Sequence, residues 1–126
     1  MSAETEILSA AAAITGADRI GALETGDRTA VMTVSGKRLV RYMDGSEKMP
    51  ADIMIGGRDT DQQALMSDMD GMCGALCSKA RTIRENGKYA VISARPVSSP
   101  APYGMSAAGK WFYKAVVQLI YIRYRS

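Results

Sequence analysis

Residue types that carry out catalysis or bind metals are scarce in this chain of 126 residues, which contains no histidine. The commonest general base and the commonest neutral metal ligand are therefore missing. The sequence has no phosphate-binding loop, nucleophile elbow or dinucleotide fingerprint. Gly56 and Gly57 are followed by Arg58 rather than by the lysine of a phosphate-binding loop, which indicates a simple turn. We therefore expect that the protein is not an enzyme and uses no cofactor.

Carboxylates and thiols are the remaining candidates for a metal or redox site. Cys73 and Cys77 lie four residues apart in a segment with helical periodicity, so they share one face and are not placed to form a disulfide. We interpret both as free, buried thiols. Four aspartates near them lack the spacing of a calcium-binding loop and indicate a solvated acidic face rather than a metal site: Asp59, Asp61, Asp68 and Asp70.

Charge is distributed unevenly along the chain, although the net charge is only +3. Residues 1–78 contain 7 basic and 12 acidic side chains, whereas residues 79–126 contain 9 basic side chains and one acidic one. This division suits contacts between copies of the chain that meet with opposite signs, but it also suits nucleic-acid binding or a solvated surface without a partner.

Basic and aromatic residues alternate in the last third of the chain, as in platforms that stack single-stranded nucleic acid. The residues are Tyr89, Arg95, Tyr103, Lys110, Trp111, Tyr113, Lys114, Tyr121, Arg123 and Tyr124. The signature of an RNA-recognition motif is absent, however, and the intervening positions are strongly aliphatic. We favour sheet packing and subunit contact, and keep a small nucleic-acid-binding module as the alternative.

The final segment, KWFYKAVVQLIYIRYRS (110–126), predicts a strand that is apolar on both faces. One set of side chains would cover the helices, and the other, left bare in a monomer, would contact a second subunit. The two sets are Trp111, Tyr113, Val117 and Tyr121, and Phe112, Val116, Ile120 and Ile122. We assign the first set to the interface, with Arg123 and Arg125 reaching Asp59 or Asp61 of a neighbouring copy.

The elements that position these residues form a single domain, 1–126. A first helix begins at the potential cap Ser2 and ends at Gly16, and a capping box formed by Thr60 and Gln63 predicts a second helix over about 61–83. Strands are expected at 28–34, 38–43, 46–55, 88–97 and in the final segment, with a hairpin turn at Asp44–Gly45 and a flexible loop over 98–110.

This order predicts an α+β fold with a single layer of antiparallel sheet, about five strands, and two helices packed on one face. Pro50 lacks a backbone donor, so the third strand should be an edge strand or should contain a bulge there. The core should contain Ile7, Leu65, Met69, Met72 and Leu76. Because the N-terminus has neither a leader pattern nor a spanning apolar run, we expect a soluble, cytoplasmic product.

Two stretches resemble a known family. RLVRYMDGSEKMPADIMIGG and YAVISARPVSSPAPYGMSAAGKWFYKAVVQLIYIRY are similar to the hairpin and the closing strand pair of tail terminator, or minor capsid (tail completion), proteins of long-tailed bacteriophages and prophages. The resemblance extends over the order of elements in the whole chain. Its motifs are loose, and the Met/Cys-rich second helix and the connector GGRDTD depart from the pattern.

The resemblance implies a virion protein made in the bacterial cytoplasm and located in the tail, at the head–tail junction. Such a subunit forms a homo-oligomeric ring, expected to be a hexamer, on the end of the tail tube. The ring stops tube polymerisation and joins the tail to the head. Its expected partners are further copies of itself, the tail tube protein and a head–tail connector protein. DNA would pass through the ring without specific binding, and no membrane is involved.

Overall fold

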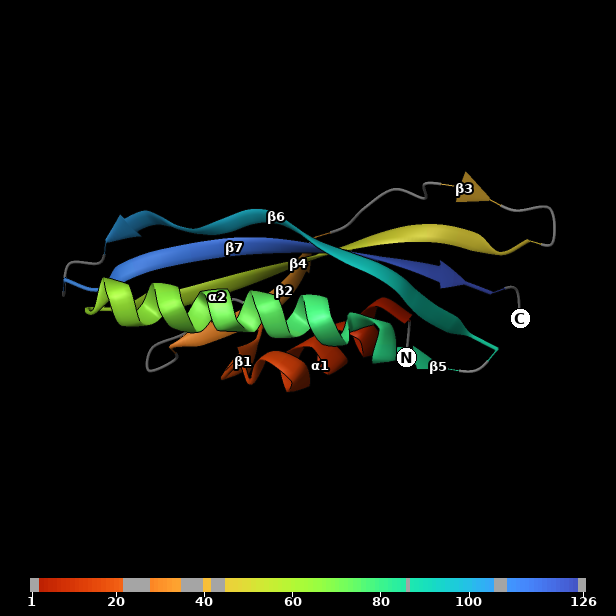
Figure 1. Ribbon diagram of the computed structural model, residues 1–126, viewed down its shortest axis with the longest axis horizontal. Coiled ribbons are helices and arrows are strands. Elements are labelled where there is room, and N and C mark those ends of the chain that lie inside the picture. Colours follow the sequence, from red (N-terminus) through yellow and green to blue (C-terminus); the bar gives the residue numbers. More distant parts are fainter. Residues whose placement is uncertain are drawn as a thin grey trace.

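Two long antiparallel strands form the centre of the sheet in the computed structural model, which describes residues 3–21, 28–34, 40–41, 45–85, 87–105 and 109–124. The strands β4 (Glu47–Asp59) and β7 (Trp111–Arg123) pair without interruption from one end to the other. β7 is rich in β-branched and aromatic residues, which favour strands, whereas β4 has only Ile53 and Ile55 of these types. Figure 1 shows that this pair extends along the long axis of the molecule.

Shorter pairings complete the sheet on both sides of the central pair. β2 (Thr29–Val34) runs antiparallel to β4, and β6 (Tyr89–Met105) runs antiparallel to β7. β1 (Arg19–Ile20) lies parallel to β2, β5 (Arg84–Glu85) pairs with β6, and β3 (Val40–Arg41) pairs with the start of β4. The described residues thus form one seven-stranded mixed sheet in the order β1-β2-β4-β7-β6-β5, with β3 beside β4.

The α+β class is confirmed, but the sheet is larger and less uniform than predicted. All five expected strands are present. The additional strands β1 and β5 have two residues each, which is too short to leave an alternating pattern in a sequence. Because β1 is parallel to β2, the sheet is mixed rather than purely antiparallel.

Both helices pack on the same face of this sheet, as expected. α1 (Ala3–Thr15) contacts β2 and β4, whereas α2 (Gln62–Lys79) lies along β4, β7 and β6 and continues into a short 3-10 helix, η1 (Ala80–Thr82) (Figure 1). The five core residues predicted from the sequence are all buried: Ile7, Leu65, Met69, Met72 and Leu76. They belong to one continuous apolar cluster between the helices and the sheet.

The helix boundaries follow local chemistry, with one correction at α2. Gly16 ends α1 in a left-handed conformation with φ of 71°, as expected. The predicted capping box of Thr60 and Gln63 is wrong, because the N-cap is Asp61, whose carboxylate accepts a hydrogen bond from the backbone N–H of Ala64 at 3.1 Å. The potential cap Ser2 lies outside the described residues.

The segment GGRD (56–59) is strand rather than turn, which corrects the sequence interpretation. Gly57 lies against two side chains of α2, those of Leu65 and Met69. A Cβ built at this position would lie 2.6 Å from the sulfur of Met69 and 2.8 Å from Cδ1 of Leu65. The glycine therefore permits close packing of helix on sheet, a role that a local turn signal does not reveal.

The predicted loop over 98–110 is also wrong in its first half, because β6 continues to Met105. Beyond its short pairing with β5, β6 pairs only with β7 within the described residues, so Pro100 and Pro102 sit in an edge strand where a missing donor is tolerated. Four register shifts interrupt the pairing and increase local bending. Residues 106–108 lie outside the described residues.

Pro50 occupies a gap in the pairing of β4. It pairs with Ile120 of β7 on one side. On the other side, the pairing with β2 ends at Asp52 and the pairing with β3 begins at Lys48. In the described part of the chain, Pro50 therefore faces no ladder partner on that side. The prediction of an edge strand or a bulge is wrong, because β4 is a central strand that pairs with β7 without a shift, and the missing donor of Pro50 is tolerated in the gap between β2 and β3. Among the described residues, no helix is long and apolar enough to cross a membrane.

Candidate functional site

The last long strand, β7, presents its two sets of side chains to different environments. The side chains that face the helices are buried: Tyr113, Ala115, Val117, Leu119 and Tyr121. Those between them remain partly or fully exposed: Phe112, Lys114, Val116, Gln118, Ile120 and Ile122. The alternation predicted for the final segment is present, and the helices cover only one of the two faces.

The expected interface set lies on the face that the subunit's own helices cover. Val117 and Tyr121 are fully buried, and Trp111 packs against the edge of the same core. Tyr113 donates its hydroxyl to Oε1 of Gln62 at 2.8 Å, which ties β7 to the start of α2. The buried side chains Tyr113, Val117 and Tyr121 are therefore not available to another subunit, and the candidate interface moves to the opposite face.

The charged residues assigned to the interface lie at opposite ends of β4 and have partners within the chain. Arg123 pairs with Glu47 at 3.1 Å, whereas Nε of Arg28 donates to Asp59 at 2.8 Å. Asp61 caps α2. Arg125 lies outside the described residues. The structure thus does not bring Arg123 close to the acidic pair within one subunit, because β4 separates them by about 40 Å along the strand.

We define the open face as the side of the sheet that faces away from α1 and α2. The pairing register places its side chains in rows across the strands. One row runs from Met32 through Met54 and Val116 to Ser98. Ile120 and Ile122 extend the apolar strip along β7. No helix of the described part of the chain lies on this face.

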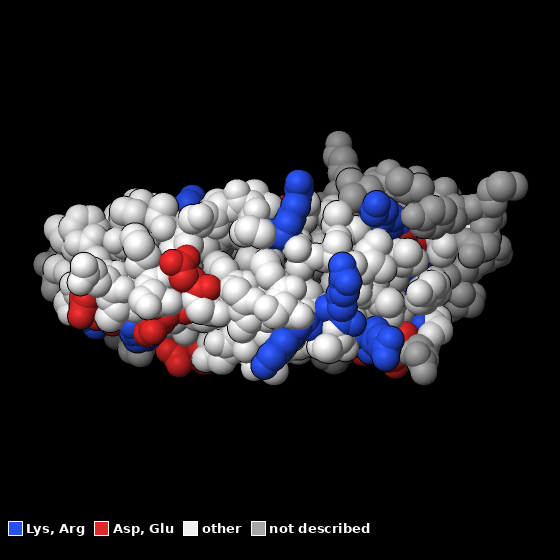
Figure 2. Space-filling view, in the orientation of Figure 1, with Lys and Arg blue, Asp and Glu red and all other residues white. Residues whose placement is uncertain are grey.

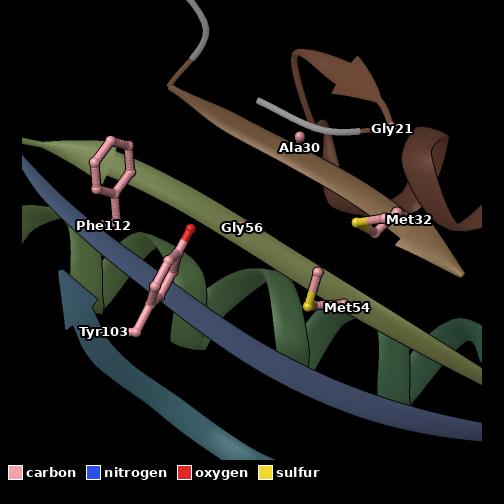
Figure 3. A pocket seen from close by; sticks show the side chains of 7 residues that line it. All are labelled: Gly21, Ala30, Met32, Met54, Gly56, Tyr103 and Phe112. Carbon is pink, nitrogen blue, oxygen red and sulfur yellow. The ribbon is translucent and has the colours of Figure 1, made fainter. Parts of the chain in front are cut away.

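A shallow groove of about 250 Å³ is hollowed into the open face. Seven residues from five segments line it: Gly21, Ala30, Met32, Met54, Gly56, Tyr103 and Phe112. In Figure 3, the side chains of Met54, Tyr103 and Phe112 project on the side of the sheet away from α2. Tyr103 belongs to the basic and aromatic set recognised in the sequence, whereas Met32 and Met54 were not predicted as contact residues, because their position beside Phe112 depends on the strand order.

Aromatic and basic groups lie next to each other at one end of this groove. The rings of Tyr103 and Phe112 have their centroids 5.9 Å apart, and the ammonium nitrogen of Lys114 lies 5.5 Å from the centroid of Tyr103. Further along the face, Nε of Arg95 donates to Oε1 of Gln118 at 3.1 Å. These contacts combine apolar surface with cation–π and polar interactions.

One buried polar atom on the open face lacks a hydrogen-bond partner among the described residues. Oδ1 of Asp52 is buried and has no hydrogen-bond partner among the described residues, although it lies in the row of Gln118. A buried acceptor without a partner destabilises the isolated subunit. A donor supplied by a contacting molecule would remove this cost.

The acidic residues near α2 are organised by one arginine. Arg28 contacts Asp59 through Nε and Asp68 through Nη1, the latter at 2.6 Å. The guanidinium, together with backbone donors from Asp61 and Thr60, holds the pKa of Asp59 below its ordinary value. No group of three or more potential metal ligands was found among the described residues.

The two thiols are free, as predicted. Cys73 is buried beside the core, and Cys77 is half-buried. Burial raises the pKa of Cys73 to about 11, with smaller contributions from Cys77 and Asp70. Burial also raises the pKa of Cys77.

Comparison with known proteins identifies a structural neighbour but no family. No family model matches the chain, and no curated protein matches it. Among solved structures, the chain is similar to one in the "Virion of native gene transfer agent (GTA) particle", with a TM-score of 0.55 and 14% sequence identity. The match covers 94% of this chain and 91% of the other, so the two share a fold over nearly their whole lengths.

Proposed function

We propose that this protein is a structural subunit of a phage-like virion that assembles through the open face of its sheet. The observation that carries the proposal is the partly exposed apolar strip formed by Met54, Val116 and Ile120, with the groove beside it. Partly exposed apolar side chains on a sheet face that no helix covers favour contact with another protein, and the polar row of Asp52 and Gln118 between Val116 and Ile120 offers hydrogen-bonding groups. The near full-length fold similarity to a chain of a gene transfer agent virion supports a place in a particle.

Within that class, we propose a tail terminator. The subunit forms a homo-oligomeric ring, a hexamer, on the end of the tail tube, stops tube growth and joins the tail to the head. Its partners are the tail tube protein and a head–tail connector protein, and DNA passes through the ring without specific binding. Ring assembly and head–tail joining require contact surfaces for other proteins rather than a nucleophile or a cofactor, so we propose no enzymatic activity.

Neighbours in a ring meet through different surfaces, and the charged ends of the sheet suit such a contact. Arg123 is exposed at one end, and Asp61 is exposed at the other. A head-to-tail arrangement would bring them together without breaking the cap of α2 completely, because a carboxylate accepts several hydrogen bonds. Asp59 is less available for this contact, since Arg28 already holds it.

The proposal is tested by the mass and shape of the purified protein. We expect light scattering to detect oligomers and electron microscopy to show rings. Val116→Asp should remain folded and lose the rings, because it places a charge in the apolar strip. Val97→Asp is the matched control, since Val97 is 56% exposed in a bulge of β6, and it should still form rings. Rings in both variants, or none in the unmodified protein, would contradict the proposal.

A small nucleic-acid-binding module remains the alternative function, favoured by the neighbouring positions of Tyr103, Phe112 and Lys114. Bases stack on exposed aromatic rings, and lysine neutralises phosphate. Titration with a labelled single-stranded oligonucleotide distinguishes the two functions. Strong binding by a monomer that weakens steeply with salt and is lost in Tyr103→Ala would support the alternative.

A further inference from the structure

The outer face of α2 carries charges that are separated along the helix. The N-cap and first half of α2 have only acidic charged residues, Asp61, Asp68 and Asp70, of which Asp68 pairs with Arg28 from outside the helix. The last residue of α2 and the segment after it have only basic ones until Glu85: Lys79, Arg81 and Arg84. All six side chains are exposed. In Figure 2, most acidic side chains on the face that carries α2 lie toward one end, and most basic ones lie toward the other.

A surface with this charge pattern is complementary to itself when two copies meet with their helices antiparallel. The acidic half of one helix then faces the basic end of the other, while a parallel arrangement would bring like charges together. Antiparallel helices related by a two-fold axis form an isologous contact, in which both subunits use the same surface. The charge pattern therefore selects a second copy of this chain as the occupant.

The centre of the same face allows two helices to approach closely. Four small residues occupy it at helical spacing, opposite the buried side of α2: Ser67, Gly71, Gly74 and Ser78. They are arranged symmetrically, since the midpoint between Gly71 and Gly74 is also the midpoint between Ser67 and Ser78. A two-fold axis through that midpoint places Gly71 of one copy against Gly74 of the other.

Packing within the subunit does not explain these two glycines. A Cβ built at Gly71 or at Gly74 would meet nothing within 4 Å. Each glycine in a helix interior costs up to about 1 kcal/mol relative to alanine, so the isolated helix loses stability at both positions. Close approach of a second helix would require small side chains at these positions and would explain both glycines.

The charged flank agrees with the same axis. Asp61, Asp68 and Lys79 lie in one row along α2, because their spacing is close to whole numbers of helical turns. The axis keeps this row on the same flank in both copies. It places Lys79 of one copy within about 3 Å, along the helix direction, of Asp68 in the other copy. Asp68 already pairs with Arg28 of its own subunit, so Lys79 would join that ion pair.

We propose that the outer face of α2 packs antiparallel against the same face of a second copy, forming a two-fold dimer. The contact is distinct from the ring proposed above, because contacts between ring neighbours are heterologous and this one is isologous. It is centred on Gly71 and Gly74 of α2, whereas the ring uses the open face and the charged ends of the sheet, with Asp61 common to both contacts. Val116→Asp removes only the first of these surfaces from the ring, and substitutions at Gly71 and Gly74 act only on the α2 contact. A failure of either contact can therefore be recognised separately.

The steric test replaces both glycines by leucine and measures the mass of the chain by sedimentation. The double variant Gly71→Leu/Gly74→Leu should lose the dimer and keep a melting temperature no lower than that of the unmodified chain, since leucine is the better helix former. Ser9→Leu places the same side chain on an exposed position of α1 and should leave the dimer intact. These measurements are made in the Val116→Asp background, so that ring contacts do not contribute.

The electrostatic test uses two variants, neither of which should form a dimer alone, although a mixture of the two should form a heterodimer. Lys79→Glu and Asp68→Lys each create like-charge contacts across the two-fold axis. Asp68→Lys also removes the ion pair with Arg28 inside the subunit, so recovery of the dimer in the mixture is the decisive measurement. In a heterodimer of the two variants, the introduced glutamate faces the introduced lysine, and the remaining Asp68 faces the remaining Lys79. Each variant alone should be monomeric, and an equimolar mixture should recover the dimer. A chain that is monomeric before substitution, or a dimer that survives the leucine variant, would overturn the proposal.

Discussion

At the scale of single residues, glycines have three different structural roles, and the residue type alone does not distinguish them. Gly16 ends a helix with a positive φ, Gly57 makes room for α2, and Gly71 has open space around it. Only the first role has a local sequence signal, since it depends on the end of a helical pattern. The second depends on which helix crosses the strand, and this information lies about ten residues further along the chain.

Gly57→Ala should destabilise the subunit by about 1–3 kcal/mol, because the added methyl group would overlap Met69 and Leu65 unless they shift. Gly71→Ala is the matched control and should raise stability by up to about 1 kcal/mol, since its Cβ meets nothing within 4 Å. Urea unfolding at a concentration where the chain is monomeric measures both. A destabilisation of equal size at the two positions would contradict the packing described at Gly57.

Cys73 should react with alkylating reagents more slowly than Cys77 in the folded protein at pH 8. The thiolate is the reactive form, and burial raises the pKa of Cys73 to about 11. Mass spectrometry of protein treated briefly with iodoacetamide would locate the label, and denaturant should make the two rates similar. Because the folded pKa lies above the ordinary value of 9.0, the neutral Cys73 contributes stability that is lost as the pH rises from about 9 to about 11.

At the scale of elements, the long strands were predictable and the partners of each face were not. The alternating apolar pattern of β7 predicted a strand with two apolar faces, and the buried face of α2 followed from its helical spacing. Which set of side chains on β7 packs against the helices depends on strand order and twist. Periodicity alone therefore could not show that Val117 and Tyr121 belong to the core rather than to an interface. Prolines in β6 misled the prediction because an edge strand tolerates them.

Val117→Asp should unfold the subunit, because it places a carboxylate among the fully buried side chains of the core. Val116→Asp, one residue away, should remain folded, since that side chain belongs to the open face. Circular dichroism during heating measures the difference. Similar melting temperatures for the two variants would mean that β7 does not divide the subunit into a core face and an open face.

At the scale of the whole molecule, the subunit has two candidate contact surfaces of different character on opposite sides of its sheet. The open face is mainly apolar around Met54, Val116 and Ile120, whereas the outer face of α2 is lined by separated charges. The uneven charge of the two halves of the sequence was compatible with contacts of opposite sign, with nucleic-acid binding and with a solvated surface. It did not predict that both signs lie along one helical face, because that depends on how α2 and η1 expose residues 61–84.

The two surfaces should respond differently to salt. At 1 M ionic strength the screening length falls to about 3 Å from about 10 Å at 0.1 M, so contacts between exposed charges weaken, while burial of apolar surface is not screened. Association of the Val116→Asp variant, which keeps only the α2 contact, should therefore decrease as sodium chloride rises from 0.1 M to 1 M. Association of the Gly71→Leu/Gly74→Leu variant, which keeps the ring contact through the apolar open face and the Arg123 and Asp61 ends, should decrease less over the same range. Sedimentation velocity at matched protein concentrations measures both. Equal salt responses would show that the separated charges on α2 do not contribute to its contact.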